Sequence, residues 1–177
     1  MNDLNLNIFD EPNWLQPIFQ NIPTILQEQP WGVWRAEPRL KDGIFTGKWS
    51  KAPRNPTTGK MVGTDKPELF GTYLEAKRAY ELGDYTGVGV LLTGKGIVGV
   101  DIDDAADTFD INPEIKGWTK KALRSGIYCE ISPSSSGLRL FMLGTMSFSG
   151  KKIGSLEIYS DVRFLTVTGH IQKLRDA

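Results

Sequence analysis

Residues 96–104 have the sequence GIVGVDIDD, and this stretch decides how the rest of the chain is interpreted. Its first half is rich in β-branched residues, which is typical of a buried strand. Because side chains alternate between the two faces of a strand, Asp101 and Asp103 project from one face while Ile102 points into the core. Adjacent carboxylates repel each other, and a divalent cation such as Mg²⁺ or Mn²⁺ removes that repulsion. The stretch predicts a metal site, against the simpler interpretation that the acidic residues end a strand in a solvated turn.

Length and composition favour one globular domain. The chain has 177 residues, of which 40% are apolar and 24% charged, as is ordinary for such a domain. Its 21 basic and 21 acidic residues balance, so affinity for nucleic acid would require local basic patches. The single cysteine, Cys129, excludes an internal disulfide and is expected to be a packed thiol. Without an apolar run of ~20 residues or a signal peptide, a cytoplasmic protein with no membrane association is expected.

The order of the expected elements predicts an α+β domain. We expect residues 1–29 to form a polar segment with short helical turns, and residues 30–177 to form one domain. Thr72 and Glu75 form a capping-box pattern that predicts a helix over residues 72–82. The expected short turns span residues 14–20 and 22–29, a second helix spans 113–124, and strands span 31–35, 88–92, 127–132, 138–143, 155–159 and 163–168. This pattern predicts a mostly antiparallel sheet with helices packed on one side.

Two turns are predicted from glycine-containing sequences. Asp42-Gly43 is typical of a hairpin turn that returns through residues 48–51. Residues 89–96, GVLLTGKG, come within one residue of a phosphate-binding P-loop. However, Gly96 stands where that loop needs Ser or Thr, and a strand follows instead of a helix. A β-hairpin turn is therefore the better interpretation of this stretch.

Glu157 is a candidate third carboxylate. It lies between Leu156 and Ile158, so it projects from the opposite face of its strand. By itself it would be an acid on the solvent side of a sheet. Together with Asp101 and Asp103 it would complete the ligand set of a two-metal centre.

The loop SPSSSGLR, which ends at Arg139, has the small residues that let an oxyanion approach the backbone closely. Ser135, Ser136, Gly137 and Arg139 are therefore candidate phosphate ligands, against the simpler interpretation of a flexible hairpin loop. Arg163 follows on a later strand. It would either neutralise phosphate or pair with the carboxylates.

A proline-rich loop carries the densest basic patch of the chain. Lys48, Lys51, Arg54 and Lys60 lie in or beside it and are candidate contacts to nucleic acid. The tryptophans nearby would either stack on bases or belong to the core.

Taken in order, these motifs resemble those of primase-polymerase domains of the archaeo-eukaryotic primase superfamily, which occur in phage and plasmid replication proteins. The resemblance extends over roughly residues 30–170. The matching stretches are residues 31–34, 51–59, 87–92, 100–104, 132–139, 156–159 and 163–170.

The resemblance implies an RRM-like catalytic sheet with an N-terminal α/β part and an active site in the cleft between them. It implies a metal-dependent nucleotidyltransferase that synthesises primers or extends DNA on a single-stranded template. Asp101, Asp103 and Glu157 would bind two Mg²⁺ or Mn²⁺ ions. The expected partners are nucleoside triphosphates, single-stranded DNA and a helicase, fused or separate.

The same resemblance implies that Arg139, Ser135 and Ser136 contact the incoming triphosphate, with Lys51 and Arg163 nearby as contacts to phosphate or template. One departure from the family pattern is the arginine at position 139, where the family often has histidine. Arginine binds phosphate bidentately but cannot shuttle a proton near neutral pH.

Three other functions share some of these features. A rolling-circle replication initiator needs paired histidines, and this chain has only His170. A Toprim domain has its glutamate before the Asp-x-Asp pair, whereas Glu157 follows it. The remaining alternative is a catalytically weak module that binds single-stranded nucleic acid and assists a separate replication enzyme. Manganese-dependent nucleotide incorporation would separate the enzyme from the module.

Overall fold

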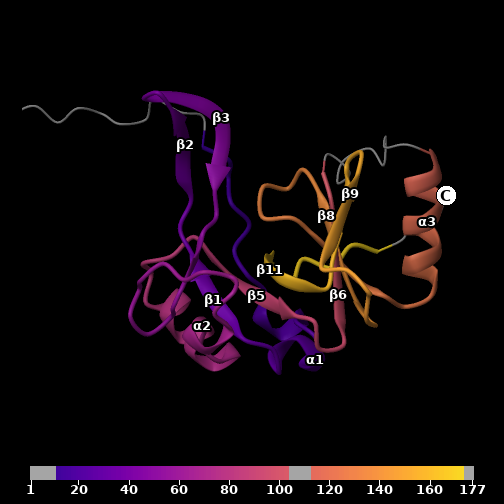
Figure 1. Cartoon of the computed structure of the whole chain (residues 1–177), viewed down its shortest axis with the longest axis horizontal. Helices are drawn as coiled ribbons and strands as arrows, with labels where there is room; N and C mark the ends of the chain where they lie inside the picture. Colours follow the sequence, from indigo (N-terminus) through magenta and orange to yellow (C-terminus); the bar gives the residue numbers. More distant parts are fainter. Residues whose placement is uncertain (1–10, 104–112, 174–177) are drawn as a thin grey trace, which may run out of the picture.

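The strands form two larger antiparallel sheets and one separate hairpin in the computed structural model, which describes residues 11–103 and 113–173 (Figure 1). The four-stranded sheet has the order β11-β5-β1-β4, the five-stranded sheet has the order β7-β8-β6-β10-β9, and β2 pairs with β3. The strands are β1 (Trp31–Trp34), β2 (Glu37–Lys41), β3 (Ile44–Ser50), β4 (Pro53–Arg54), β5 (Gly87–Thr93), β6 (Ile97–Ile102), β7 (Tyr128–Ile131), β8 (Leu138–Leu143), β9 (Gly150–Ile153), β10 (Leu156–Tyr159) and β11 (Asp161–Val167). The predicted α+β class with mostly antiparallel strands is confirmed.

The two longer helices lie where the sequence predicts them, and each covers a different sheet (Figure 1). Helix α2 (Tyr73–Glu81) packs on the four-stranded sheet, and α3 (Pro113–Arg124) on the five-stranded one. The predicted capping box is present, because Thr72 Oγ1 accepts from the Glu75 backbone N–H and the Glu75 carboxylate accepts from the Thr72 N–H. The other helices are α1 (Thr24–Gln27) and the 3₁₀ turns Phe19–Asn21 and Pro67–Leu69. The helical turn predicted over residues 14–20 is thus wrong except at its end.

The turn at residues 93–96 joins two sheets and does not form a hairpin. β5 pairs with β1 and β11, whereas β6 pairs with β8 and β10. The predicted hairpin is therefore wrong, although the tight turn itself is present, with Gly94 and Gly96 at φ +74° and +82°. The sequence signal for the turn is local, while the choice of pairing partner is set by distant strands. A second crossing, from β10 to β11, brings the chain back to the four-stranded sheet.

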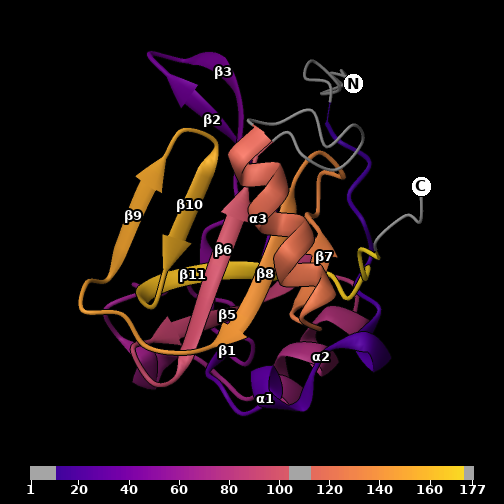
Figure 2. The same cartoon turned by 90° about the vertical axis from the view of Figure 1, so that its right-hand side faces the viewer.

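Two hydrophobic clusters fix the orientation of β6. Val100 and Ile102 pack with Ala122 of α3, so this face of the five-stranded sheet is apolar. Asp101 lies between them in sequence and projects from the other face, on the side where β11 crosses (Figure 2). The other cluster contains Trp31, and both Trp31 and Trp34 are core residues, with exposures of 0% and 1%.

The β2–β3 hairpin stands clear of the two larger sheets (Figure 1). Asp42 and Gly43 have φ values of 52° and 79°, which are the left-handed conformations that a tight hairpin turn requires. The turn predicted at Asp42-Gly43 is therefore confirmed. Asp104, the last residue of the acidic stretch, lies outside the described residues. No helix among those described is long and apolar enough to span a bilayer.

Candidate active site

Charged side chains cross the five-stranded sheet in a single transverse row. Each is the direct cross-strand neighbour of the next, and direct neighbours project from the same face of a sheet. In strand order, the row is Glu130, Arg139, Asp101, Glu157 and Lys152. The predicted proximity of Asp101 and Glu157 is therefore present as a direct pairing between β6 and β10.

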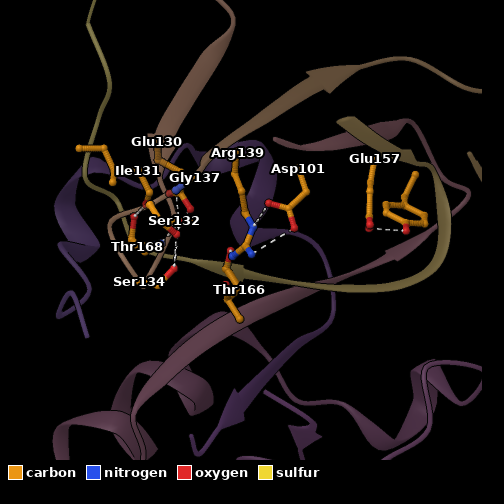
Figure 3. Close-up of polar contacts among 12 residues, drawn as sticks. Asp101, Glu130, Ile131, Ser132, Ser134, Gly137, Arg139, Glu157, Thr166 and Thr168 are labelled. Atoms are coloured by element: carbon orange, nitrogen blue, oxygen red, sulfur yellow. Dashed lines mark hydrogen bonds and ion pairs between the residues drawn. The ribbon is translucent and has the colours of Figure 1, made fainter. Parts of the chain in front are cut away.

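Arg139 lies between Asp101 and the backbone of β11 (Figure 3). Its Nε donates to Oδ1 of Asp101 at 3.2 Å, its Nη2 donates to Oδ2 at 3.4 Å, and its Nη1 donates to the Thr166 carbonyl at 2.8 Å. The Arg139 side chain is only 7% exposed. The guanidinium therefore neutralises Asp101 and ties the two sheets together. Sequence reasoning placed Arg139 on the triphosphate but did not foresee this ion pair.

Glu157 is held by three neighbouring side chains. It accepts hydrogen bonds from Lys152 on β9, from Tyr159 Oη at 2.6 Å and from Arg163 Nη2 at 3.1 Å. Burial alone would raise its pKa, but the hydrogen bonds from Lys152 and Tyr159 and the charges of Lys152 and Arg163 outweigh burial and lower the pKa. The carboxylate is therefore ionised at neutral pH. The sequence analysis missed Lys152, although Gly154 between two short runs is a signal for the β9–β10 turn.

Asp103 is exposed just beyond the end of β6, where its backbone N–H donates to the Ser155 carbonyl. Asp101, Asp103 and Glu157 line one cavity of ≈ 550 Å³. Within residues 11–103 and 113–173, no three His, Cys, Asp or Glu side chains are grouped closely enough to hold a metal ion. The carboxylates therefore share a cavity, and the assignment of all three as metal ligands stays a prediction.

The serine loop presents hydroxyls to the same cavity. Ser134 and Ser136 line it, and their hydroxyl oxygens lie 3.0 Å apart. Ser135, a predicted phosphate ligand, has φ +64° and is not among the lining residues. A Cβ on Gly137 would lie 2.7 Å from the Ile102 carbonyl oxygen, so this glycine is needed for close packing of the loop on β6. Of the predicted hydroxyl ligands, Ser136 thus lines the cavity and Ser135 does not, while Ser134 was missed.

Lys51 lies inside the candidate site. Its Nζ is 5.1 Å from the ring centre of Trp14 and 6.0 Å from that of Trp34, within range of cation–π attraction. Burial, followed by the charge of Arg139, lowers the Lys51 pKa to about 8, against the opposing effect of Asp101 and Asp103. Sequence analysis missed Trp14, because nothing in its local sequence connects it to Lys51.

The other basic residues predicted to contact nucleic acid do not form one patch. Arg54 Nη2 pairs with Glu37 at 2.6 Å, and its Nη1 donates to the Gly59 carbonyl, so its side chain holds the loop together. Lys48 is exposed on β3 and lines the same cavity as the carboxylates. Lys60 is exposed on the loop but is absent from the linings of the cavities that contain Asp101.

A second cavity, of ≈ 380 Å³, adjoins the first and is rich in cationic side chains. Arg39, Lys51 and Arg163 line both cavities, as does Asp101. Arg163 Nε and Thr166 Oγ1 are buried and have no hydrogen-bond partner, and both residues line the second cavity. The three carboxylates therefore gather in the first cavity, while cations line both. Such an arrangement suits a phosphate chain that approaches a carboxylate cluster.

The chain is similar in sequence to a phage replication protein. No family model matches the chain. The chain is 28% identical over 155 residues to a protein of Nitratiruptor phage NrS-1 named DNA primase-polymerase. The match extends over 82% of this chain and 20% of the phage protein, so the chain spans about one fifth of the length of that relative. The match confirms that this chain resembles a phage primase-polymerase domain.

Proposed function

We propose that this chain is the catalytic domain of a primase-polymerase, which joins nucleotides on a single-stranded DNA template during replication of a mobile element such as a phage. The observation that carries the proposal is the cross-strand pair of Asp101 and Glu157, which shares a cavity with Asp103 beside a second, cation-rich cavity. The name of the similar phage protein supports the same reaction class. The proposed partners are nucleoside triphosphates, single-stranded DNA and a helicase, fused or separate, in the cytoplasm of the host cell.

The donor set suits a divalent cation, because three carboxylates from neighbouring strands line one cavity. Asp101, Asp103 and Glu157 would hold two Mg²⁺ or Mn²⁺ ions. The bound metal would neutralise phosphate charge and favour ionisation of the attacking hydroxyl.

The chain's own cations and hydroxyls would bind the nucleotide. Lys51 and Arg163 line the space next to the carboxylates, where their charges would neutralise the oxygens of a triphosphate. The hydroxyls of Ser134 and Ser136 would donate to the same group. Arg139 is better suited to orient Asp101, because all of its described hydrogen bonds go to Asp101 and to the Thr166 carbonyl.

The decisive experiment is incorporation of labelled nucleotides on a single-stranded template with Mg²⁺ or Mn²⁺. Asp101→Asn should abolish incorporation, and Glu157→Gln should reduce it less severely, because water replaces a third ligand in part. Asp84→Asn is the matched control, since Asp84 is exposed on the loop after α2. Wild-type rates in both Asp101→Asn and Glu157→Gln would refute the assignment of the carboxylates.

A second function is favoured by one observation. Asp101 and Glu157 are already paired with cationic side chains, and no group of three metal-ligating residues is preformed in the part of the chain that is described. A module that binds single-stranded nucleic acid without catalysis fits these ion pairs. Binding of single-stranded DNA by a wild-type protein that incorporates no nucleotide with either metal would support this alternative.

A further inference from the structure

The β2–β3 hairpin carries an exposed basic surface that the carboxylate chemistry does not use. Arg39, Lys41 and Lys48 are all exposed on it. Among the ion pairs found in residues 11–103 and 113–173, none includes any of these three side chains. Of the two acids on the hairpin, Glu37 is neutralised by Arg54, and Asp42 lies at the turn. The surface is therefore positively charged along most of its length.

Apolar and aromatic groups are interleaved with these charges. Leu40 and Ile44, near the tip, are 56% and 73% exposed. Phe45 pairs with Leu40 near the tip, and its ring lies 5.6 Å from that of Trp49. Trp49 is farther from the tip and contacts Trp14 edge-on at 6.2 Å. Cations beside apolar and aromatic groups are the combination that proteins use to bind single strands, because phosphates meet the cations and bases pack on the rings.

The hairpin surface is continuous with the candidate active site. Arg39, Lys48 and Trp49 line the same cavity as Asp101 and Asp103. The hairpin also projects away from the two larger sheets (Figure 1). A DNA strand bound along it would therefore run from solvent to the carboxylates. The exposed cations require a partner with regularly spaced negative charges, which the phosphates of a DNA strand supply and an ordinary protein surface does not.

We propose that the β2–β3 hairpin is an arm that binds single-stranded DNA and guides it into the candidate active site. This inference rests on the proposed function and goes beyond it, because it moves the binding surface from the proline-rich loop to the hairpin. Arg39, Lys41 and Lys48 contact the phosphates, and the exposed apolar side chains at the tip pack against bases.

The test compares two triple variants in which the same number of charges is lost. One is Arg39→Ala/Lys41→Ala/Lys48→Ala. The control is Lys116→Ala/Lys120→Ala/Lys121→Ala on α3, which covers the opposite face of the five-stranded sheet. Binding of a labelled single-stranded DNA is measured by fluorescence anisotropy over a range of salt concentrations, and thermal unfolding verifies that each variant is folded.

Each phosphate contact to a single strand contributes about 0.7 to the slope of log K against log salt, so loss of three contacts should flatten the slope by about 2.1. The α3 variant should keep the wild-type slope. A wild-type slope in the hairpin variant, or equal losses in the two variants, would overturn the proposal.

A second measurement does not depend on weakened binding. Ile44→Cys places a thiol at the tip for a fluorophore, and native Cys129, which is 1% exposed, escapes labelling. Addition of single-stranded DNA should change the fluorescence, whereas an unchanged signal while DNA is bound would overturn the proposal. Nucleotide incorporation is assayed in parallel. Its absence in a wild-type protein that binds DNA through the hairpin refutes the proposed function alone, and its presence with hairpin-independent binding refutes the arm alone.

Discussion

The ion pair between Asp101 and Arg139 should stabilise the fold when no divalent cation is bound. Their side chains are 16% and 7% exposed, and Arg139 also donates to the Thr166 carbonyl. Arg139→Met removes the charge but keeps an unbranched side chain that fills part of the space. It leaves a largely buried carboxylate without its cation and a buried carbonyl without its donor. Breaking a buried pair in this way costs about 3–5 kcal/mol, and the cavity next to Asp101 favours the lower end, about 3 kcal/mol.

Asp101→Asn should lower the free energy of unfolding less than Arg139→Met does, because the amide oxygen of the new side chain still accepts a hydrogen bond from Arg139. Replacing a charge-assisted hydrogen bond by a neutral one loses about 1.5 kcal/mol. In the Arg139→Met background, Asp101→Asn removes a charge that has no partner, so it should hardly change the free energy of unfolding. The double variant should therefore lose about 3 kcal/mol rather than about 4.5 kcal/mol, which corresponds to a coupling energy of about 1.5 kcal/mol.

Urea unfolding of the wild type, the two single variants and the double variant, with a chelator present, measures this cycle. Arg163→Met is the matched control, because Arg163 pairs with Glu157 but its side chain is 42% exposed. Its loss should cost less than about 1 kcal/mol. If the double variant loses the sum of the two single losses to within about 0.5 kcal/mol, Asp101 and Arg139 are not coupled and the reasoning is refuted.

Three further predictions concern the cavity and the serine loop. The Lys51 pKa of about 8 means that Lys51 loses its charge as the pH rises through that value, so nucleotide affinity should fall there. Lys51→Arg should flatten this dependence in a nucleotide-binding titration, and an equally steep profile would argue against a contact from Lys51. Gly137→Ala should destabilise the protein by about 1–3 kcal/mol in thermal unfolding, because the new Cβ would lie 2.7 Å from the Ile102 carbonyl. Ser135→Gly, at φ +64°, should be neutral or stabilising by up to about 1 kcal/mol, and the reverse order would contradict the packing argument.

Features with local signals could be predicted from the sequence. The alternation of side chains along a strand placed Asp101 on the polar face, and the same rule placed Glu157 opposite Leu156 and Ile158. The capping box at Thr72 and the Asp42-Gly43 turn are also local patterns, and both are present. Each of these features depends on a few neighbouring residues, so distant parts of the chain do not alter it.

Features that depend on strand pairing could not be predicted. The turn after β5 was expected to form a hairpin, because the sequence cannot show that β11 pairs with β5 and that β8 and β10 pair with β6. Likewise, Arg54 was assigned to nucleic acid on the basis of its charge. Its pairing with Glu37 follows from the way that the β2–β3 hairpin leaves β1 and returns to β4.

The electrostatics of the candidate site follow from this pairing. The sequence predicts that Asp101 and Asp103 require a cation to relieve their repulsion. The sheet order, however, places Arg139 on one side of Asp101 and Glu157 on the other, and Glu157 is itself paired with Lys152 and Arg163. The fold therefore carries internal counter-ions for its carboxylates. A divalent cation at Asp101 would have to compete with the Arg139 guanidinium, so the contact that stabilises the metal-free protein also opposes metal binding. Under the proposed function, a nucleotide that brings its own phosphate charge would give Arg163 and Lys51 an alternative partner, which favours metal and nucleotide binding together.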